Sequence, residues 1–448
     1  MKCLPASKLP QARGTVLHDW HAEVLAIRAF NRFVLEECRQ LALRPDAESL
    51  FLRRRTPADH DEVIVPASAG PPFLWRPDVR LHMYCSEAPC GDASMELTMA
   101  AQEDAAPWEV PAPAAATTTS TVRNSGTPPP ETAPLPGRAY FSLLGAVRRK
   151  PARADAAATA SKSCSDKLAL RQCVSLLSSA ASLLVAPGPT RRCPLSPTTS
   201  AHPPATGPAS ETPGFATEDE DQDHASPVYI RTLVLPTAQY SARGCQRAFG
   251  GDGGEGSGRM APLSPQPQPQ PQPPRWDAGY AFHPFAVRTT ASEFTFSRRA
   301  VALRGALTAC NLAVAWTAPA LLGSGSGQEP GSGMGVGMGI EESTLAGLVR
   351  GRKAVDARGR GASALCRRTM WALAVEVAGL LASSDPDSVA EVRRALAGSA
   401  AREGEQPGTY AAVKASALLA PRRRVKEDVW AVALRGWVRN EGDDGFVL

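Results

Sequence analysis

The sequence predicts a mixed α/β domain in which buried helices alternate with strands. Residues 19–43 repeat apolar side chains at helical spacing around most of the circumference, which is typical of a helix inside a domain, with Asp19 at its N-cap. Residues 79–85 alternate apolar and polar side chains, as a half-buried strand does, and a helix is expected soon afterwards, from Gly91. This order of elements favours a sheet flanked by helices.

Further elements follow along the chain. A second buried helix is expected over Ser165–Val185, with Ser165 or Asp166 as its cap. Two more strands are expected, over Tyr229–Pro236 and Asn311–Ala318. Residues 321–340 are rich in glycine and predict a loop. Helical segments are expected near the C terminus, over 363–383, 387–398, 408–419 and 425–435.

Three low-complexity segments separate these elements. Residues 104–136 are rich in Pro, Ala and Thr, residues 187–225 in Pro, Ser and Thr, and residues 250–274 include a Pro-Gln repeat. All three are poor in large apolar residues, so burial there cannot offset the entropy of ordering. We therefore expect one domain over 1–448 with long disordered inserts that catalysis does not need.

Composition limits the class of protein further. The 448 residues are 43% hydrophobic, enough for a sizeable core, and the net charge of +5 suits a polyanionic partner, although ordinary surface charge explains it equally well. Ten cysteines at irregular spacing do not predict a disulfide framework. The N terminus lacks the apolar core of a secretory signal, and no apolar run reaches membrane-spanning length. We expect a soluble protein of the cytoplasm or nucleus.

Three short motifs hold the parts of a hydrolytic zinc site. They are His21-Ala22-Glu23, Pro89-Cys90-Gly91-Asp92-Ala93 and Ser163-Cys164-Ser165-Asp166-Lys167. One imidazole and two thiolates, from His21, Cys90 and Cys164, would leave the fourth position of a tetrahedral Zn²⁺ open for water. Glu23 lies two residues from the imidazole, where it can shuttle a proton. Each residue alone is more often structural, and the prediction rests on their combination.

Other side chains compete for the metal. Cys85 lies close to Cys90, but it falls on the apolar face of the predicted strand, so we interpret it as a core residue. His18 and His82 are weaker competitors, and both are expected to be structural.

The motifs resemble a known family. Nucleobase deaminases carry H-x-E followed by P-C-x-x-C; here Ala93 stands where the close second cysteine would be, and the next suitable thiol is Cys164. In this form and order the motifs resemble the eukaryotic adenosine deaminases that act on RNA, and most closely the tRNA-specific branch, which makes inosine beside the anticodon of tRNA-Ala. Residues 2–26 and 436–443 are similar to that branch as well.

The resemblance implies a fold and a reaction. The fold is a cytidine-deaminase-like α/β/α sandwich with a helical C-terminal extension, here a single editase domain over 1–448. In the family a further segment precedes the stretch that begins at Lys2, so we expect this domain to lack its first strand and helix. The reaction is zinc-dependent hydrolysis of adenosine to inosine in tRNA, 3′ of the anticodon, with Glu23 delivering protons to the ring and to the leaving ammonia.

The resemblance also implies a buried inositol hexakisphosphate, because many phosphate charges can be buried only among many cations and donors. The candidate residues are Arg28, Lys167, Arg367, Tyr410, Lys414, Lys426 and Trp437. Arg28 supports this most, since it is a charge within an apolar helix; the alternative is a set of surface cations. Asp166 and Lys167 would link the ligand loop to the polyphosphate.

Contacts with RNA are less readable. No RRM, KH or double-stranded RNA-binding motif is present. The clusters Arg148-Arg149-Lys150 and Arg422-Arg423-Arg424 would suit tRNA phosphates, or be solvated faces. Two alternatives to tRNA deamination stay open: an adenosine deaminase on double-stranded mRNA, and a zinc-folded RNA-binding pseudoenzyme. The partner is tRNA in the main interpretation, with no membrane and no protein partner predicted.

Overall fold

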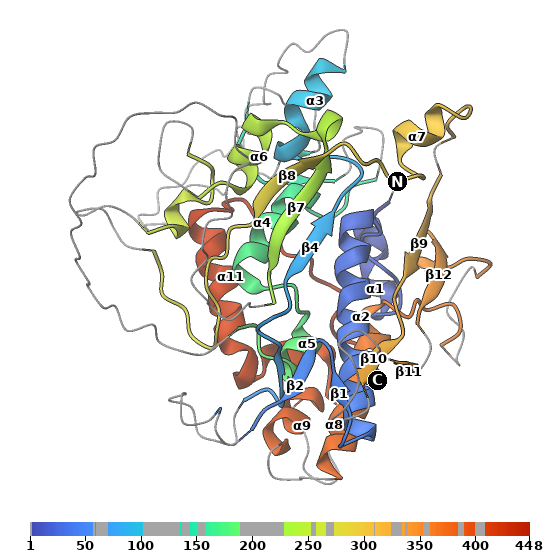
Figure 1. Cartoon of the computed structure of the whole chain (residues 1–448), viewed down its shortest axis with the longest axis vertical. Coiled ribbons are helices and arrows are strands. Elements are labelled where there is room, and N and C mark those ends of the chain that lie inside the picture. Colours follow the sequence, from blue (N-terminus) through green and yellow to red (C-terminus); the bar gives the residue numbers. More distant parts are fainter. Residues whose placement is uncertain are drawn as a thin grey trace, which may run out of the picture.

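The structure is a computed structural model of the whole chain (Figure 1). It describes residues 2–56, 59, 70–101, 135–136, 143–150, 157–188, 228–251, 257–265, 273–308, 310–323, 334–336, 339–352, 359–383, 389–398 and 408–448. The predicted inserts 104–136 and 187–225 lie almost entirely outside the described residues, so their disorder stays a prediction.

Helices and strands alternate along the described residues, and the α/β class is confirmed. The helices are α1 (Leu9–Ala12), α2 (Ala22–Leu43), α3 (Met95–Ala100), α4 (Cys164–Val174), α5 (Ser179–Leu184), α6 (Ala242–Phe249), α7 (Arg298–Ala302), α8 (Arg367–Ala382), α9 (Ala390–Leu396), α10 (Tyr410–Ala415) and α11 (Ala420–Val432). The strands are β1 (Glu48–Ser49), β2 (Leu52–Arg54), β3 (Phe73–Trp75), β4 (Leu81–Tyr84), β5 (Leu135–Pro136), β6 (Arg148–Arg149), β7 (Ile230–Pro236), β8 (Ala286–Thr290), β9 (Leu312–Trp316), β10 (Ala320–Gly323), β11 (Met334–Val336), β12 (Glu341–Leu345) and β13 (Leu348–Val349).

A parallel sheet in the order β4-β7-β8 lies at the centre of Figure 1, with α2 to its right and α11 to its left. Because its strands are parallel, the loops that leave β4, β7 and β8 all start at one edge of the sheet. The other strands form small antiparallel sheets, β1-β10-β11, β13-β12-β9 and β2-β3. Since β10 and β11 pair with each other inside 321–340, the prediction of a loop over that whole stretch is wrong.

The long helix α2 runs through the core. Its apolar residues pack against α8, α5 and the strands β9 and β10, as its periodicity predicts. The N-cap prediction is wrong: His21, not Asp19, occupies that position. The carboxylate of Asp19 does not cap α2, because it is bound by other side chains, as described below. The cap of α4 is likewise Ser163, whose Oγ accepts from the N–H of Asp166 at 3.1 Å.

The second predicted helix, Ser165–Val185, is in fact two helices. Ser175, with a φ of 60°, ends α4, and α5 begins at Ser179. Asn31 of α2 holds the break: its Nδ2 donates to O of Leu176 at 2.8 Å, and its Oδ1 accepts from the N–H of Ser178 at 2.5 Å. The apolar pattern continues across the break, which is why periodicity alone does not reveal it.

Part of the third predicted insert is packed. Within 250–274, residues 257–265 are described, and Met260 and Leu263 are buried in the main hydrophobic core. The prediction of a flexible insert is therefore wrong for this stretch, which the surrounding Pro, Gly and Gln residues conceal.

The C-terminal part of the described chain adds α8, α9, α10 and α11 to the same core, which extends from α2 to Val429 and Phe446. Among the described residues, no helix combines the length and the hydrophobicity that crossing a membrane requires.

Candidate active site

The two cysteine motifs lie against each other. Cys90 follows β4 after a short loop, and Cys164 is the first residue of α4. The backbone N–H of Cys164 donates to Sγ of Cys90 at 3.3 Å. Gly91 has a φ of 107°, and a Cβ there would lie 2.4 Å from Oγ of Ser163, so the close approach of the two loops requires glycine. The fold thus pairs two thiols from distant parts of the sequence.

His21 is held by Asp19. Nδ1 of His21 lies 2.8 Å from Oδ1 of Asp19. The other oxygen of this carboxylate accepts from Nζ of Lys150 at 2.9 Å, from Oγ of Ser161 at 2.6 Å, and from Nζ of Lys167. With Nδ1 engaged in this way, Nε2 is the nitrogen left for a metal.

These contacts set the protonation of both groups. Burial alone would raise the pKa of Asp19, but Lys167 and Lys150 hold it well below its usual range. Burial lowers the pKa of His21, but the hydrogen bonds with Asp19 and Cys3 outweigh that effect and raise it to about 9. Asp19 is therefore ionised at neutral pH and holds a proton on Nδ1 of His21, while the raised pKa means that a bound metal would have to displace a second proton, from Nε2.

Lys150 and Glu23 both influence the pKa of the two thiols. Nζ of Lys150 lies 3.1 Å from Sγ of Cys164. The hydrogen bond between the thiols lowers the pKa of Cys90, whereas burial raises that of Cys164. Glu23 raises the pKa of both thiols electrostatically, which shows that its carboxylate is near them. Lys150 thus favours the thiolate of Cys164 but does not offset its burial, and a divalent cation would ionise both thiols.

The donor set fits zinc, which takes thiolate sulfur and imidazole nitrogen. The geometry leaves the choice of ligands open, however. Among the described residues, the group of possible ligands whose atoms all lie within 4.8 Å of one another is Cys3, Asp19 and His21. The predicted set of His21, Cys90 and Cys164 is not as compact. Asp19 is already bound to two lysines, so we interpret it as the residue that orients His21; Cys3 is a further candidate ligand that sequence reasoning missed.

The competing ligands considered from sequence lie elsewhere. Cys85 is in the hydrophobic core, and burial raises its pKa. His18 is buried, with Nε2 2.5 Å from Oδ2 of Asp443. His82 is on β4, on the same side as the exposed Tyr84.

A buried ionic network joins the segments that follow the two cysteines. Asp92 lies 3.8 Å from Nε of Arg148, 3.9 Å from Nε of Arg247 and 3.7 Å from Nη1 of Arg259. Arg259 also binds Asp166 at 2.5 Å, and Asp166 accepts from the N–H of Arg148 at 3.0 Å. Asp166 therefore lies behind Cys164 and connects its loop to that of Cys90.

This network overturns one sequence interpretation. Arg148 and Lys150 are buried, at 1% and 6% exposure, and both serve the site from within. Two of the three cations in the cluster Arg148-Arg149-Lys150 are thus neither part of a solvated face nor able to contact tRNA phosphates. From the sequence alone, a run of cations does not reveal that carboxylates from distant segments will surround it.

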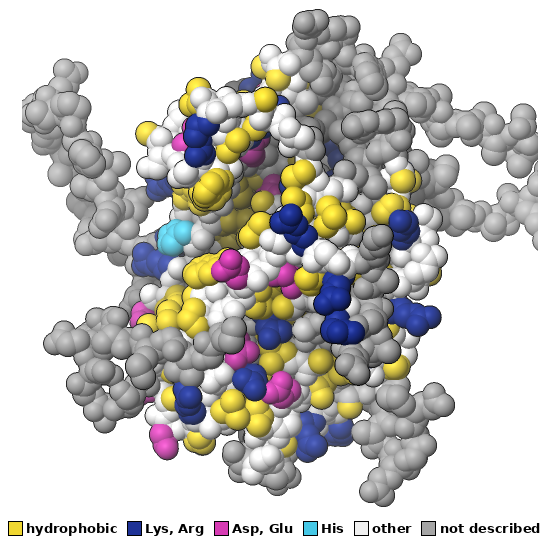
Figure 2. Space-filling model, turned by 90° about the vertical axis from the view of Figure 1, so that its right-hand side faces the viewer, with side chains coloured by type: hydrophobic (Ala, Val, Ile, Leu, Met, Phe, Trp, Pro, Cys, Tyr) yellow, Lys and Arg dark blue, Asp and Glu magenta, His cyan; other side chains and the backbone are white. Residues whose placement is uncertain are grey.

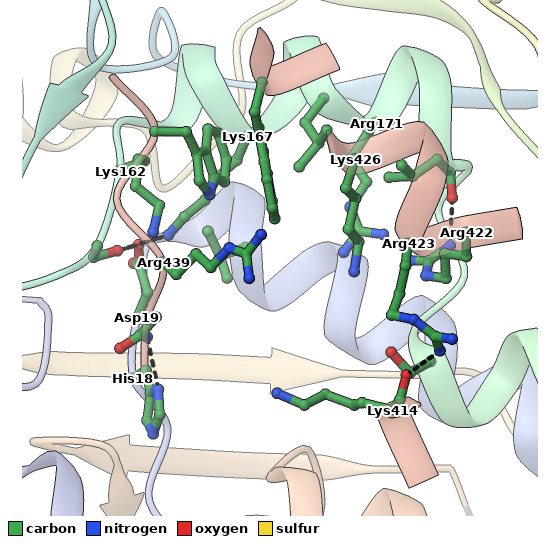
Figure 3. A pocket seen from close by; sticks show the side chains of 18 of the residues that line it. His18, Asp19, Lys162, Lys167, Arg171, Lys414, Arg422, Arg423, Lys426 and Arg439 are labelled. Atoms are coloured by element: carbon green, nitrogen blue, oxygen red, sulfur yellow. Dashed lines mark hydrogen bonds and ion pairs between the residues drawn. The ribbon is translucent and has the colours of Figure 1, made fainter. Parts of the chain in front are cut away.

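A cavity of about 530 Å³ lies next to this site and is rich in cations. It is walled by α2, α4, α11 and the C-terminal segment, and Figure 3 shows Lys414, Lys426 and Arg439 pointing into a common space. Its lysines and arginines are Arg28, Lys162, Lys167, Arg171, Arg367, Lys414, Arg422, Arg423, Lys426 and Arg439. Its acids are fewer: Asp19, Glu427, Glu441 and Asp444. The lining therefore carries an excess of positive charge.

Most residues predicted for a polyphosphate line this cavity. They are Arg28, Lys167, Arg367, Lys414, Lys426 and Trp437. Tyr410 does not; its ring stacks on Phe446 at 5.2 Å, behind the cavity wall. Arg422 and Arg423 were assigned to a surface cluster, but they also line the cavity. Arg422 is buried, donating to O of Val174 at 2.6 Å.

The cavity holds cations that the protein does not neutralise. Burial lowers the pKa of Arg28 to about 10, with repulsion from Arg367 adding to the effect, and the pKa of Arg171 to about 9. Burial also places the pKa of Lys426 well below its usual value. Within the described residues, neither Arg28 nor Lys426 has a hydrogen-bond or ion-pair partner. Such a set of facing cations destabilises the fold unless an anion lies beside it.

The cavity and the cysteine site share residues. Asp19 and Lys167 line the cavity, and Asp19 also holds His21. Lys162 contacts the C-terminal segment, donating to O of Val438 at 2.5 Å, with its Nζ 4.9 Å from the ring centre of Trp437. An anion in the cavity would therefore act on the orientation of His21 through a single side chain.

Comparison with known proteins agrees with the motifs. Residues 1–185 match the model of the adenosine-deaminase (editase) domain family. The tRNA-specific adenosine deaminase 1 of Schizosaccharomyces pombe is 32% identical over 299 residues, which cover 66% of this chain and 56% of that protein. The protein of that name from Saccharomyces cerevisiae is 32% identical over 185 residues, 40% of this chain and 39% of its own length. That from Homo sapiens is 34% identical over 94 residues, 21% of this chain and 16% of its own.

The chain spans little more than half the length of the S. pombe protein. Its predicted resemblance to eukaryotic tRNA adenosine deaminases is confirmed by these matches.

Proposed function

We propose that this chain is a zinc-dependent deaminase that hydrolyses adenosine to inosine in tRNA, in the cytoplasm or nucleus. The observation that best supports this proposal is the contact between the Cys90 and Cys164 motifs, with Glu23 near the two thiols. His21 completes the set of donors, with its Nδ1 held by Asp19. This arrangement supplies nitrogen and sulfur donors together with a carboxylate that is not committed to binding a cation. The matching of residues 1–185 to the editase domain supports the same reaction.

Each residue has a separate task in the proposed reaction. His21, Cys90 and Cys164 would hold the zinc, with Cys3 as the alternative to one thiol. The ion supplies Lewis acidity, which makes a water molecule acidic near neutral pH. Glu23 would accept the first proton of that water and pass it to the purine ring as the oxygen adds, and would then carry the second proton, from the new hydroxyl group, to the amino group that leaves as ammonia. Asp19 keeps the proton on Nδ1 of His21, so that Nε2 remains a donor of electrons.

The substrate class follows from the relatives and from the chemistry. The relatives above are named for tRNA, and the target base must leave its stack to reach a buried site. An anticodon loop presents its bases unpaired, which lowers that cost. We infer that an adenosine 3′ of the anticodon, as in tRNA-Ala, is the substrate.

Metal content and inosine formation test this function together. The full chain, purified with zinc, should convert adenosine to inosine in one or more of a panel of purified tRNAs. Glu23→Gln should retain zinc and lose activity, because Glu23 moves protons and does not bind the metal. Zinc loss in Glu23→Gln, or near-normal activity, would contradict the role. A metal-loaded wild type that makes no inosine in any tRNA would refute the function.

The ligand set has its own test. Cys164→Ser and Cys90→Ser should each lose zinc, whereas Cys85→Ser should retain it. Cys3→Ser decides between the two geometries: retained zinc supports the predicted set, and loss of zinc with retention in Cys164→Ser would place the metal at Cys3 instead.

We further propose that the cavity binds inositol hexakisphosphate. The excess of cations and the lack of partners for Arg28 and Lys426 support a densely charged anion of this kind. Protein purified without added ligand should release inositol hexakisphosphate on acid denaturation, at close to one molecule per chain. Folded, active protein without bound polyphosphate would refute this proposal and leave the deaminase function standing.

A further inference from the structure

An exposed aromatic loop crosses the sheet edge at which the cysteine motif begins. The chain leaves β8 at Thr290 and reaches Tyr84, the last residue of β4, on the other side of β7. Oη of Tyr84 accepts from the N–H of Phe294 at 3.1 Å and donates to O of Ser292 at 3.5 Å. The loop over residues 291–297, called the aromatic loop below, is therefore fixed to the strand that leads into Cys90.

The aromatic loop presents two phenylalanines to solvent. Phe296 is 71% exposed and Phe294 51%, and their ring centres lie 5.6 Å apart in a T-shaped pair. Arg304 lies over the ring of Phe296, with Cζ 5.9 Å from its centre, and donates to O of Thr295. The rings are thus held in place rather than buried. Aromatic side chains rarely stay exposed in this way unless a partner covers them.

The charge around the rings selects the kind of partner. Exposed cations flank the aromatic loop: Arg288 on β8, Arg298 and Arg299 on α7, and Arg304. The acid among them, Glu293, lies 3.8 Å from Arg299. Figure 2 shows the face that bears α7 and β9, with hydrophobic side chains around a hollow in its upper half and Lys and Arg side chains among them. Rings beside cations match the bases and phosphates of single-stranded nucleic acid.

We propose that the aromatic loop is a stacking platform for unpaired nucleotides next to the target adenosine. This proposal rests on the proposed function, because it places RNA at the neighbouring zinc site. Unpaired bases would stack on Phe294 and Phe296, and the arginines would contact the adjoining phosphates.

RNA affinity tests the platform. The full chain carrying Glu23→Gln, which binds without turnover, is titrated into a fluorescein-labelled RNA hairpin of the anticodon-arm type and followed by anisotropy. Stacking on an aromatic side chain contributes about 1–3 kcal/mol per base, which is about fivefold to more than a hundredfold in Kd. Phe294→Leu with Phe296→Leu should raise Kd within that range, and Phe296→Trp should retain the wild-type value. In the active enzyme, which retains Glu23, replacing both phenylalanines by leucine should raise KM for tRNA more than it lowers kcat.

The matched control is Leu50→Ala, which removes a side chain that is 41% exposed between β1 and β2, at the opposite end of the molecule in Figure 1. It should leave Kd unchanged. An unchanged Kd in the double variant refutes the platform while inosine formation by the wild type upholds the enzyme. The platform is also refuted if the double variant alters self-association in light scattering but not the Kd for RNA, because the rings would then form a contact between proteins. A wild type that makes no inosine refutes the proposed function separately.

Discussion

Replacing Arg28 by methionine should stabilise the ligand-free protein and reduce the further stabilisation that a polyanion provides. In the ligand-free protein the guanidinium faces other cations, and burial lowers its pKa from 12.5 to about 10. At 1.36 kcal/mol per pKa unit, the charged group destabilises the ligand-free fold by about 3 kcal/mol at neutral pH. Methionine carries no charge and fills a similar space, so the free energy of unfolding should rise toward that value.

With inositol hexakisphosphate bound, half or more of that gain in stability should be lost. A hydrogen bond between charged groups contributes about 1.5–3 kcal/mol, so the variant should bind the polyphosphate roughly tenfold to a hundredfold more weakly. The stabilisation gained on adding ligand should fall by the same amount.

Urea unfolding measures both effects. Protein unfolded in urea, dialysed and refolded with zinc is compared with and without inositol hexakisphosphate. Arg424→Met is the matched control, because Arg424 is an exposed neighbour of Arg423 on α11 that does not line the cavity. If Arg28→Met destabilises the ligand-free protein, or leaves the gain from the polyphosphate intact, Arg28 is not an unneutralised cation of a polyanion site.

Three further outcomes are expected. Arg259→Met should destabilise the protein by about 3–5 kcal/mol in urea unfolding and lower its zinc content in metal analysis, since it leaves the buried Asp166 without its guanidinium partner. The control Arg243→Met, at an exposed position, should change neither quantity. Burial lowers the pKa of Lys426, so the stability of the free protein should rise with pH up to about the ordinary lysine pKa of 10.5; a bound polyphosphate should raise that pKa again, and calorimetry in buffers of different ionisation enthalpy should show less proton uptake on binding in Lys426→Met. Replacing 189–227 by a short Gly/Ser linker should preserve folding and inosine formation, because O of Pro187 accepts from the N–H of Val228 at 2.8 Å and the ends are adjacent; the same replacement of 257–265 should yield insoluble protein.

Sequence periodicity was sufficient where a local pattern decides the structure. Both α2 and β4 follow from the spacing of their apolar residues, and the contact between the motifs of Cys90 and Cys164 agrees with the order of the motifs, whereas zinc binding by His21, Cys90 and Cys164 stays a prediction. The break at Ser175 could not be predicted, because a serine at positive φ leaves no sequence signal and Asn31 fixes it from another helix.

The same limit applies to the charges. Lys150 and Arg422 look like surface residues in sequence, since each stands in a short run of cations. Both are buried because carboxylates and carbonyls from remote segments surround them: Asp19 binds Lys150, and O of Val174 binds Arg422. The role of Asp19 depends on the same long-range packing, so its position before His21 suggested only a helix cap.

The walls of the cavity come from opposite ends of the chain. Arg28 is on α2, whereas Lys426 and Trp437 are synthesised several hundred residues later. During synthesis the cations of α2 and α4 therefore stay exposed until the C-terminal segment has been made. Contacts between residues so far apart in the sequence form slowly. The proposed polyphosphate would therefore find its complete site only once both walls are in place. A chain truncated before Trp437 would keep the cations of α2 and α4 but lack a wall that encloses them.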